Sequence, residues 1–267
     1  METSEVSFSA KDVMALRQKT GMGMMDCKKA LTESNGDPAS AEELLREQVK
    51  GKMETRTERA TGEGRIGIAI DGTSACIIEI LTETDFTAKS EGFVTMTEDI
   101  AKMAMGQAAG DLTATDEIKT RIDDVRLTTK ENVNFARGVK LEGGSFGSYL
   151  HHDGKRAVLV QIEGEADADT LKGICQHIVF HDPLGISADD VPASKIEEIK
   201  ADALQQAKDT GKNEEIAQKI AAGKVRRYLE DNTLMAQKYV LDESKTITEI
   251  LPEGTTIKAF IRYTLGA

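Results

Sequence analysis

The sequence changes twice from strand-like apolar runs around an Asp-Gly pair to apolar residues at helical spacing. One Asp-Gly pair lies at 71–72, inside the stretch 66–81, and the other lies at 153–154, inside the stretch 148–162. Asp-Gly favours the two-residue turn of a β-hairpin, so each stretch predicts two antiparallel strands. An acidic loop and an apolar helix follow each predicted hairpin. The repeat therefore predicts an α+β fold whose core contains two related hairpin-plus-helix subdomains, at 65–143 and 144–267.

The two predicted units differ in the connection between the second strand and the helix. The first unit carries extra residues there, which include the segment Thr-Asp-Phe-Thr-Ala-Lys at 84–89. A loop that is longer than its counterpart requires is more often functional than structural. A phenyl ring at the tip of such a loop keeps apolar area in water, at a cost of roughly 1.5–3 kcal/mol. We interpret Phe86 as a wedge for a pocket of another protein, with Asp85 and Lys89 fixing its approach.

Residues 1–50 have the pattern of a module of three short helices. Ser9 followed by Asp12 suggests a capping box at the start of the first helix. The connections between the helices resemble those of the ubiquitin-associated three-helix domain. Residues 51–64 are rich in Thr, Glu and Arg and carry almost nothing apolar, which predicts a linker with few contacts across this boundary.

The region of about 193–229 predicts an antiparallel coiled-coil hairpin inserted in the second subdomain. Its apolar residues keep coiled-coil spacing in both halves: Ile196, Ile199, Ala203 and Ala207, then Ile216 and Ile220. A narrow seam with charged flanks suits two helices that project from a body. The apolar run 257–263 then predicts a closing strand.

Composition and charge limit the classes of function. The net charge is −12, and phosphate neutralisation needs a basic surface, so the charge disfavours direct binding of nucleic acid. No apolar stretch approaches the ~20 residues that a membrane-spanning helix needs, and the acidic start lacks the pattern of a signal peptide. Cys27, Cys76 and Cys175 are widely spaced, which is typical of free thiols in a reducing cytosol. We expect a cytoplasmic protein with no direct nucleic-acid or membrane contact.

Catalytic and metal sites are weakly supported. The string at 62–67 matches the dinucleotide fingerprint, but its glycines precede a strand, whereas that fold needs them after one. Cys175, His177 and His181 share one predicted helix, but no further ligand stands at a convincing spacing, so we interpret them as partly buried helix residues. No nucleophile–base pair and no pair of catalytic carboxylates emerges. The sequence therefore predicts a binding protein that is not an enzyme and has no cofactor or metal.

Methionines gather at the start of the second predicted helix. Met22, Met24 and Met25 surround a glycine there. Methionine at helical spacing is usually part of a core, but three are too many to bury at this point, and flexible thioethers suit adaptable protein interfaces. We expect one of them to be buried, and Met24 and Met25 to lie nearest a partner.

Two motifs give the chain a family resemblance. The segment at 84–89 with the Gly-Phe pair at 92–93, and the segment LRQKTGMGMMDCKKAL at 16–31, resemble the two signatures of the elongation factor Ts family in the same order and spacing. Weaker matches at 147–149 and 244–246 extend the resemblance over nearly the whole chain.

The resemblance implies a guanine-nucleotide exchange factor that binds elongation factor Tu, both GDP-bound and nucleotide-free, and promotes GDP release. In that family the Asp and Phe of the signature loop, here Asp85 and Phe86, push into the GTPase domain near its Mg²⁺ site. The resemblance also implies partner contacts for other residues of the two signatures and for one residue at the second hairpin turn: Thr84, Lys89, Arg17, Met24, Met25 and His151.

The sequence departs from the family pattern at two places. Thr87 stands where an apolar residue is common, and Lys238-Tyr239 stands where Gln-Pro-Phe-like residues are common, which can alter the contact of the second subdomain. Two alternatives stay open. An adaptor that uses the three-helix module would be tested by a pull-down, and a metalloenzyme built around Cys175 would be tested by elemental analysis.

Overall fold

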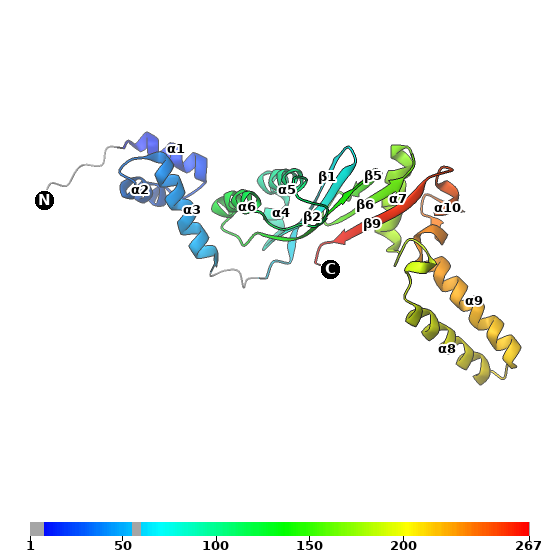
Figure 1. Ribbon diagram of the computed structural model, residues 1–267. Coiled ribbons are helices and arrows are strands. Elements are labelled where there is room, and N and C mark those ends of the chain that lie inside the picture. The colour runs from blue at the N-terminus through cyan, green and yellow to red at the C-terminus, as the bar shows by residue number, and fades with distance from the viewer. Residues whose placement is uncertain (1–7, 55–59, 267) are drawn as a thin grey trace.

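The computed structural model describes residues 8–54 and 60–266, which form an elongated molecule of helices and sheets (Figure 1). The N-terminal part consists of three helices: α1 (Ala10–Thr20), α2 (Met24–Glu33) and α3 (Pro38–Glu54). The capping box of α1 is confirmed, since Ser9 Oγ accepts from Asp12 N and Asp12 Oδ2 accepts from Ser9 N. Helix α3 continues past residue 50, where the module was predicted to end. Residues 55–59 of the predicted linker lie outside the described residues.

The three-helix module contacts the core through a small surface. Helix α6 (Asp116–Thr129) of the core contributes Leu127, which is buried in the apolar cluster of the module. Beside it, Arg46 Nη1 of α3 lies 2.5 Å from Asp124 Oδ1 of α6. The composition of the linker does not reveal this contact. On the core, the apolar part of the contact is a single residue, Leu127, which lies far from the linker in the sequence.

The first sheet is antiparallel and has the strand order β1-β2-β4-β3. Its predicted hairpin is confirmed as β1 (Glu63–Asp71) and β2 (Ser74–Thr82), and the other strands are β3 (Gly110–Asp111) and β4 (Asn134–Glu142). Strand β4 was not predicted, because charged residues interrupt its apolar pattern. One of them, Arg137, finds its partner across the sheet, where its Nε donates to Glu79 Oε2 at 2.6 Å.

The second sheet has the order β5-β6-β9 and contains the second predicted hairpin and the closing strand. These strands are β5 (Ser145–Leu150), β6 (Arg156–Glu163) and β9 (Thr256–Thr264), and helix α7 (Ala168–His181) follows β6. Each unit therefore contains a hairpin followed by a helix, as the repeat predicts.

The two sheets pack face to face between layers of helices (Figure 1). In β2, Ile78 and Ile80 pack under α5 (Glu91–Ala104) and α6, while Ile77 faces the second sheet. In β6, Val158 and Val160 pack under α7 in the same way. Strands buried on both faces read as continuous apolar runs, which explains why 75–81 and 157–162 lack alternation.

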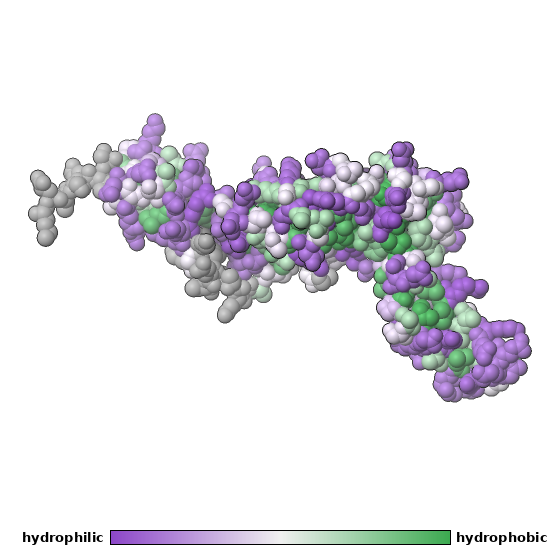
Figure 2. Space-filling model, in the orientation of Figure 1, coloured by the Kyte–Doolittle hydropathy of each residue, from purple (hydrophilic) through white to green (hydrophobic). Residues whose placement is uncertain are grey.

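The predicted helical hairpin is formed by α8 (Ala193–Asp209) and α9 (Glu214–Asn232), which project from the body (Figure 1). The buried seam between the two helices consists of alanines, which are smaller than the isoleucines that were also predicted there. Ala203, Ala207, Ala217 and Ala221 are buried, whereas Ile216, which was placed in the seam, is 43% exposed. Alanines allow the two helices to approach closely. Figure 2 shows a mainly hydrophilic surface toward the tip of the hairpin and more hydrophobic surface near its base.

A short helical turn, η1 (Ala188–Asp190), leads into α8. Four short elements return the chain from α9 to β9: η2 (Leu234–Ala236), β7 (Lys238–Tyr239), β8 (Asp242–Thr246) and α10 (Ile247–Ile250). None of the helices in the described ranges is both long and apolar enough to span a bilayer.

The docking of the module predicts a stability effect at Leu127. We expect Leu127→Ala to lower the free energy of unfolding by about 2–4 kcal/mol, because it leaves a cavity between module and core. The matched control is Leu241→Ala, since Leu241 is mostly exposed and its truncation should change stability by less than about 0.5 kcal/mol. Urea denaturation measures both variants, and equal effects would contradict a buried contact at Leu127.

Candidate functional site

The segment that carries Phe86 is a single helical turn, α4 (Asp85–Lys89), and not the open loop that was predicted. Thr84 is its N-cap, with a side chain that accepts a hydrogen bond from Thr87 N at 3.3 Å. Thr87 and Ala88 are buried against the core, so the opposite side of the turn faces solvent. Phe86 lies on that side and is 85% exposed. The sequence correctly predicts an exposed ring, and the structure adds a helical mount for it.

A salt bridge spans α4. Lys89 Nζ donates to Asp85 Oδ2 at 2.7 Å, one helical turn away. This hydrogen bond, with the charges of Lys89 and Lys155, lowers the pKa of Asp85. The same hydrogen bond and the charge of Asp85 raise the pKa of Lys89. Both groups are therefore charged at neutral pH and flank the exposed ring.

The base of α4 is held by Glu131, which the sequence interpretation missed. The Glu131 carboxylate accepts hydrogen bonds from the hydroxyl of Thr82, the backbone N–H of Thr84 and the hydroxyl of Thr84. Burial raises the pKa of Glu131, but hydrogen bonds from Thr84, Thr87 and Thr82 outweigh it and the pKa lies below its ordinary value. No local pattern marks this glutamate, because its partners belong to a different part of the chain.

The turn of the second hairpin lies next to the start of β1 and near α4. Lys155 Nζ is 2.5 Å from Glu63 Oε2, and the carbonyl of Gly154 accepts from Ile66 N at 2.9 Å. Lys155 is close enough to lower the pKa of Asp85 through its charge. The second hairpin therefore brings a cation to α4.

His151 begins this second turn. Its Nδ1 is 2.9 Å from the Tyr149 hydroxyl, and its ring packs against that of His152 at 4.2 Å between centroids. His151 is partly exposed. Its placement fits a surface residue held in one orientation, and not a catalytic base in a closed pocket.

The N-terminal signature residues lie on the three-helix module. Met22 is buried, whereas Met24 and Met25 are exposed, Met25 by 74%. A hollow between α1 and α2 is lined by Met14, Met24 and Lys28 among others, and a second hollow along α1 is lined by Met14 and Arg17. This surface combines thioethers with cations. The structure thus separates the predicted site residues into two groups, one on the module and one around α4.

Cys175, His177 and His181 form no metal site. Cys175 and His177 are fully buried, and burial raises the pKa of Cys175 to about 12. The Nε2–H of His177 donates to Gln237 Oε1 at 3.0 Å, and its Nδ1 accepts from Val240 N at 3.2 Å. Across residues 8–54 and 60–266, no group of three or more His, Cys, Asp or Glu side chains could hold a metal ion. Cys175 and His177 are core residues of α7, whereas His181, at the end of this helix, is exposed.

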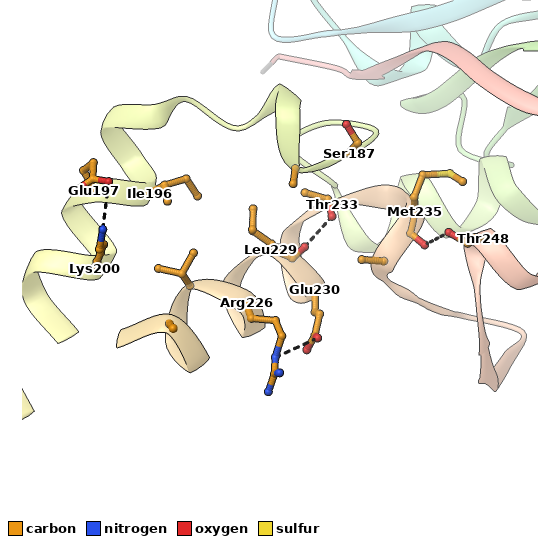
Figure 3. A pocket seen from close by; sticks show the side chains of 14 residues that line it. Ser187, Ile196, Glu197, Lys200, Arg226, Leu229, Glu230, Thr233, Met235 and Thr248 are labelled. Atoms are coloured by element: carbon orange, nitrogen blue, oxygen red, sulfur yellow. Dashed lines mark hydrogen bonds and ion pairs between the residues drawn. The ribbon is translucent and has the colours of Figure 1, made fainter. Parts of the chain in front are cut away.

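A hollow at the base of the α8–α9 hairpin is lined by both apolar and polar side chains, with Ile196 and Leu229 facing it from the two helices (Figure 3). Two ion pairs stand at its rim, Arg226 with Glu230 and Lys200 with Glu197. Its lining contains neither histidine nor cysteine, and its charged groups are paired. This hollow therefore offers no catalytic arrangement.

Comparison with known proteins agrees with the two motifs. The family model described as Elongation factor TS matches residues 83–267, from the segment that leads into α4 to the C-terminal end of the chain. The chain is 35% identical to the protein named Elongation factor Ts from Alkalilimnicola ehrlichii, over 274 aligned positions that cover 98% of this chain and 93% of that protein. The second match extends the similarity into the three-helix module.

The buried His177 predicts a pH dependence of stability. Burial lowers its pKa from 6.5 to about 4 against the opposing effect of the Gln237 hydrogen bond, so between these values the unfolded chain binds a proton that the folded chain does not. Stability should therefore fall by about 3 kcal/mol as the pH drops from about 6.5 to about 4. Urea denaturation at a series of pH values measures this slope, and His177→Gln should flatten it. A wild-type slope near zero in this window would contradict a neutral buried histidine.

Proposed function

The chain belongs to the elongation factor Ts family, and we propose that it binds elongation factor Tu and acts as a guanine-nucleotide exchange factor that promotes GDP release. The observation that carries this proposal is the exposed Phe86 on a capped helical turn, flanked by a charged Asp85–Lys89 pair. An exposed aromatic ring on a firm mount is suited to a pocket of another protein.

The affinities of a GTPase for its nucleotide and for an exchange factor determine what such a wedge must do. GTPases can hold a nucleotide near nanomolar affinity, on the order of −12 kcal/mol. An exchange factor binds the nucleotide-free GTPase more tightly than the nucleotide-bound GTPase. By linkage, its binding lowers the affinity of the GTPase for the nucleotide by the same factor. Mg²⁺ and the backbone amides of the phosphate loop carry much of the affinity for the phosphates. Disturbing that site is therefore an efficient route to release.

We assign the wedge to α4. The Phe86 ring enters the GTPase domain near its Mg²⁺ site, and Asp85 brings a carboxylate beside it. Lys89 holds Asp85 in place through their 2.7 Å salt bridge, and Thr84 caps the turn. Thr87 is buried under the turn, so its departure from the family pattern affects the mount and not the exposed wedge.

The other predicted contacts provide binding energy. On the module, Met24, Met25 and Arg17 grip the same GTPase domain, and their exposed thioethers and guanidinium suit an adaptable surface. His151, on the second subdomain, contacts another domain of elongation factor Tu. Because the module is docked on α6, its contact surface keeps a fixed relation to α4.

The finer organisation is also part of this proposal. The N-terminal module, which extends to the end of α3, is a ubiquitin-associated-like domain. The subdomains at 65–143 and 144–267 arose by duplication, with the helical hairpin of about 193–229 inserted in the second. The protein acts in the cytoplasm by binding a protein and not by catalysing a reaction on a substrate. Its net charge of −12 opposes direct binding to nucleic acid.

The central test is Phe86→Ala. Truncation of an interface hot spot costs about 2 kcal/mol or more, so catalysed release of labelled GDP from elongation factor Tu should slow by roughly 30-fold or more. Because Phe86 is exposed, the melting temperature should stay unchanged. If the ring were a core residue, truncation would lower the free energy of unfolding by about 3–5 kcal/mol.

The matched control is Phe180→Ala. Phe180 is 75% exposed on α7, so its truncation removes the same group from another surface. It should leave GDP release unchanged. Equal exchange rates for the Phe86→Ala variant and the wild type would refute the wedge.

The projecting hairpin predicts a second functional result. Replacing residues 195–228 with a short Gly/Ser linker should preserve GDP release from isolated elongation factor Tu, because the alanine seam packs the two helices on each other. Circular dichroism and a GDP-release assay measure the outcome. Lost exchange together with loss of more helix than the excised residues contain would show that the hairpin supports the core.

A further inference from the structure

The backbone around Glu131 is fixed by the end of α6. Helix α6 ends at Thr129, and its C-cap Lys130 has a left-handed φ of 60°, which reverses the chain. Arg126 of the last turn donates through Nε to the carbonyl of Val133 at 2.9 Å, and Val133 is buried in the core. The position of the Glu131 carboxylate is therefore set by the core before any partner binds.

That carboxylate joins the end of β2 to the start of α4. Its Oε2 accepts from Thr82 Oγ1 at 2.9 Å and from Thr84 N at 3.0 Å, and its Oε1 accepts from Thr84 Oγ1 at 2.6 Å. A return bond runs the other way, from Asn132 N to Glu83 Oε1 at 2.8 Å. An ionised carboxylate has acceptor sites for all three donors, and such charge-assisted bonds are the stronger class.

The bond to the Thr84 hydroxyl also decides whether α4 is capped. A hydroxyl has one hydrogen to donate and two lone pairs. When Thr84 donates its hydrogen to Glu131, its oxygen is left to accept from Thr87 N, which is the capping bond of α4. A helix of this length has little stability of its own. The orientation of Phe86 therefore depends on Thr84, and that of Thr84 depends on Glu131.

We propose that Glu131 is a positioning residue for nucleotide exchange, which holds α4 so that Phe86 is presented in one orientation before the partner arrives. This role rests on the proposed exchange function. Glu131 itself lies beneath the turn and is half-buried, so it acts through Thr84 and Phe86. Without it, the rest of the surface still binds elongation factor Tu, but the ring is delivered to the nucleotide site less often.

The first test measures GDP release from elongation factor Tu against the concentration of the full chain. For Glu131→Ala we expect the maximal rate to fall by about tenfold, with a smaller change in the half-saturating concentration. Glu131→Gln keeps one carbonyl acceptor and should give an intermediate rate, and it serves if the alanine variant folds poorly. An unchanged maximal rate for both variants would overturn the positioning role.

A matched control separates positioning from general stability. Glu249 also binds an N-cap threonine, but within its own helix: it completes the capping box of α10, where its Oε2 accepts from Thr246 N at 2.6 Å and from Thr246 Oγ1 at 2.9 Å. Glu249→Ala should lower the melting temperature to a similar extent and leave the maximal exchange rate unchanged. Equal losses of exchange in the Glu131 and Glu249 variants would show that Glu131 is merely structural.

A double-mutant comparison identifies the route of the effect. If Glu131 acts through Phe86, Glu131→Ala should cause no further loss in a Phe86→Ala background. Additive losses would overturn the positioning role. Normal release by Glu131→Ala alongside slow release by Phe86→Ala would overturn it while leaving the wedge intact. Normal release by Phe86→Ala alone would overturn the wedge and, with it, the positioning role.

Discussion

The hydrogen bonds between the Glu131 carboxylate and the start of α4 are the interaction on which, in our proposal, the position of Phe86 depends. They attach a turn that is too short to be stable alone to the rigid end of α6. The same helix carries Leu127, which is buried in the three-helix module, and Asp124, which pairs with Arg46 of α3. One end of one helix thus supports both groups of proposed partner contacts. Their spacing is a property of the core and not of the connecting segment.

The two packed sheets also support the proposed contact at His151, on the second hairpin turn. Ile77 of β2 and Leu159 of β6 pack in the cluster between the sheets, and the carbonyl of Gly154 accepts from Ile66 N. These contacts place the second hairpin turn, with Lys155, near α4. Because interiors are close-packed and transmit strain, displacement of one contact surface is resisted by the others. A rigid frame of this kind lets binding energy from several surfaces act at one site.

Local signals predicted much of the fold, and long-range partners account for what they missed. The Ser9 cap, the two hairpins and the exposed Phe86 each follow from a few neighbouring residues. The turns differ from the prediction, since Asp71 pairs with Ser74 and the second connection spans residues 151–155. Strand β4 was not predicted, because the partners of Arg137 lie on other strands: Glu79 on β2 and Tyr263 on β9. Glu131 and the docking of the module depend likewise on contacts between distant segments. In α9, spacing favoured Ile216 and Ile220, whereas close approach of the helices buries Ala217 and Ala221.

The most direct measurement of the central claim is the Mg²⁺ dependence of exchange. Release of labelled GDP from elongation factor Tu would be followed with and without the chain, at millimolar Mg²⁺ and after chelation of the ion. We propose that Phe86 acts by disturbing the Mg²⁺ and phosphate site. Removal of the ion already disturbs this site, so the factor by which the chain accelerates GDP release should be smaller after chelation. For the Phe86→Ala variant, the acceleration of GDP release should differ less between the two Mg²⁺ conditions than it does for the wild type. An acceleration factor that is the same with and without Mg²⁺ would contradict the account.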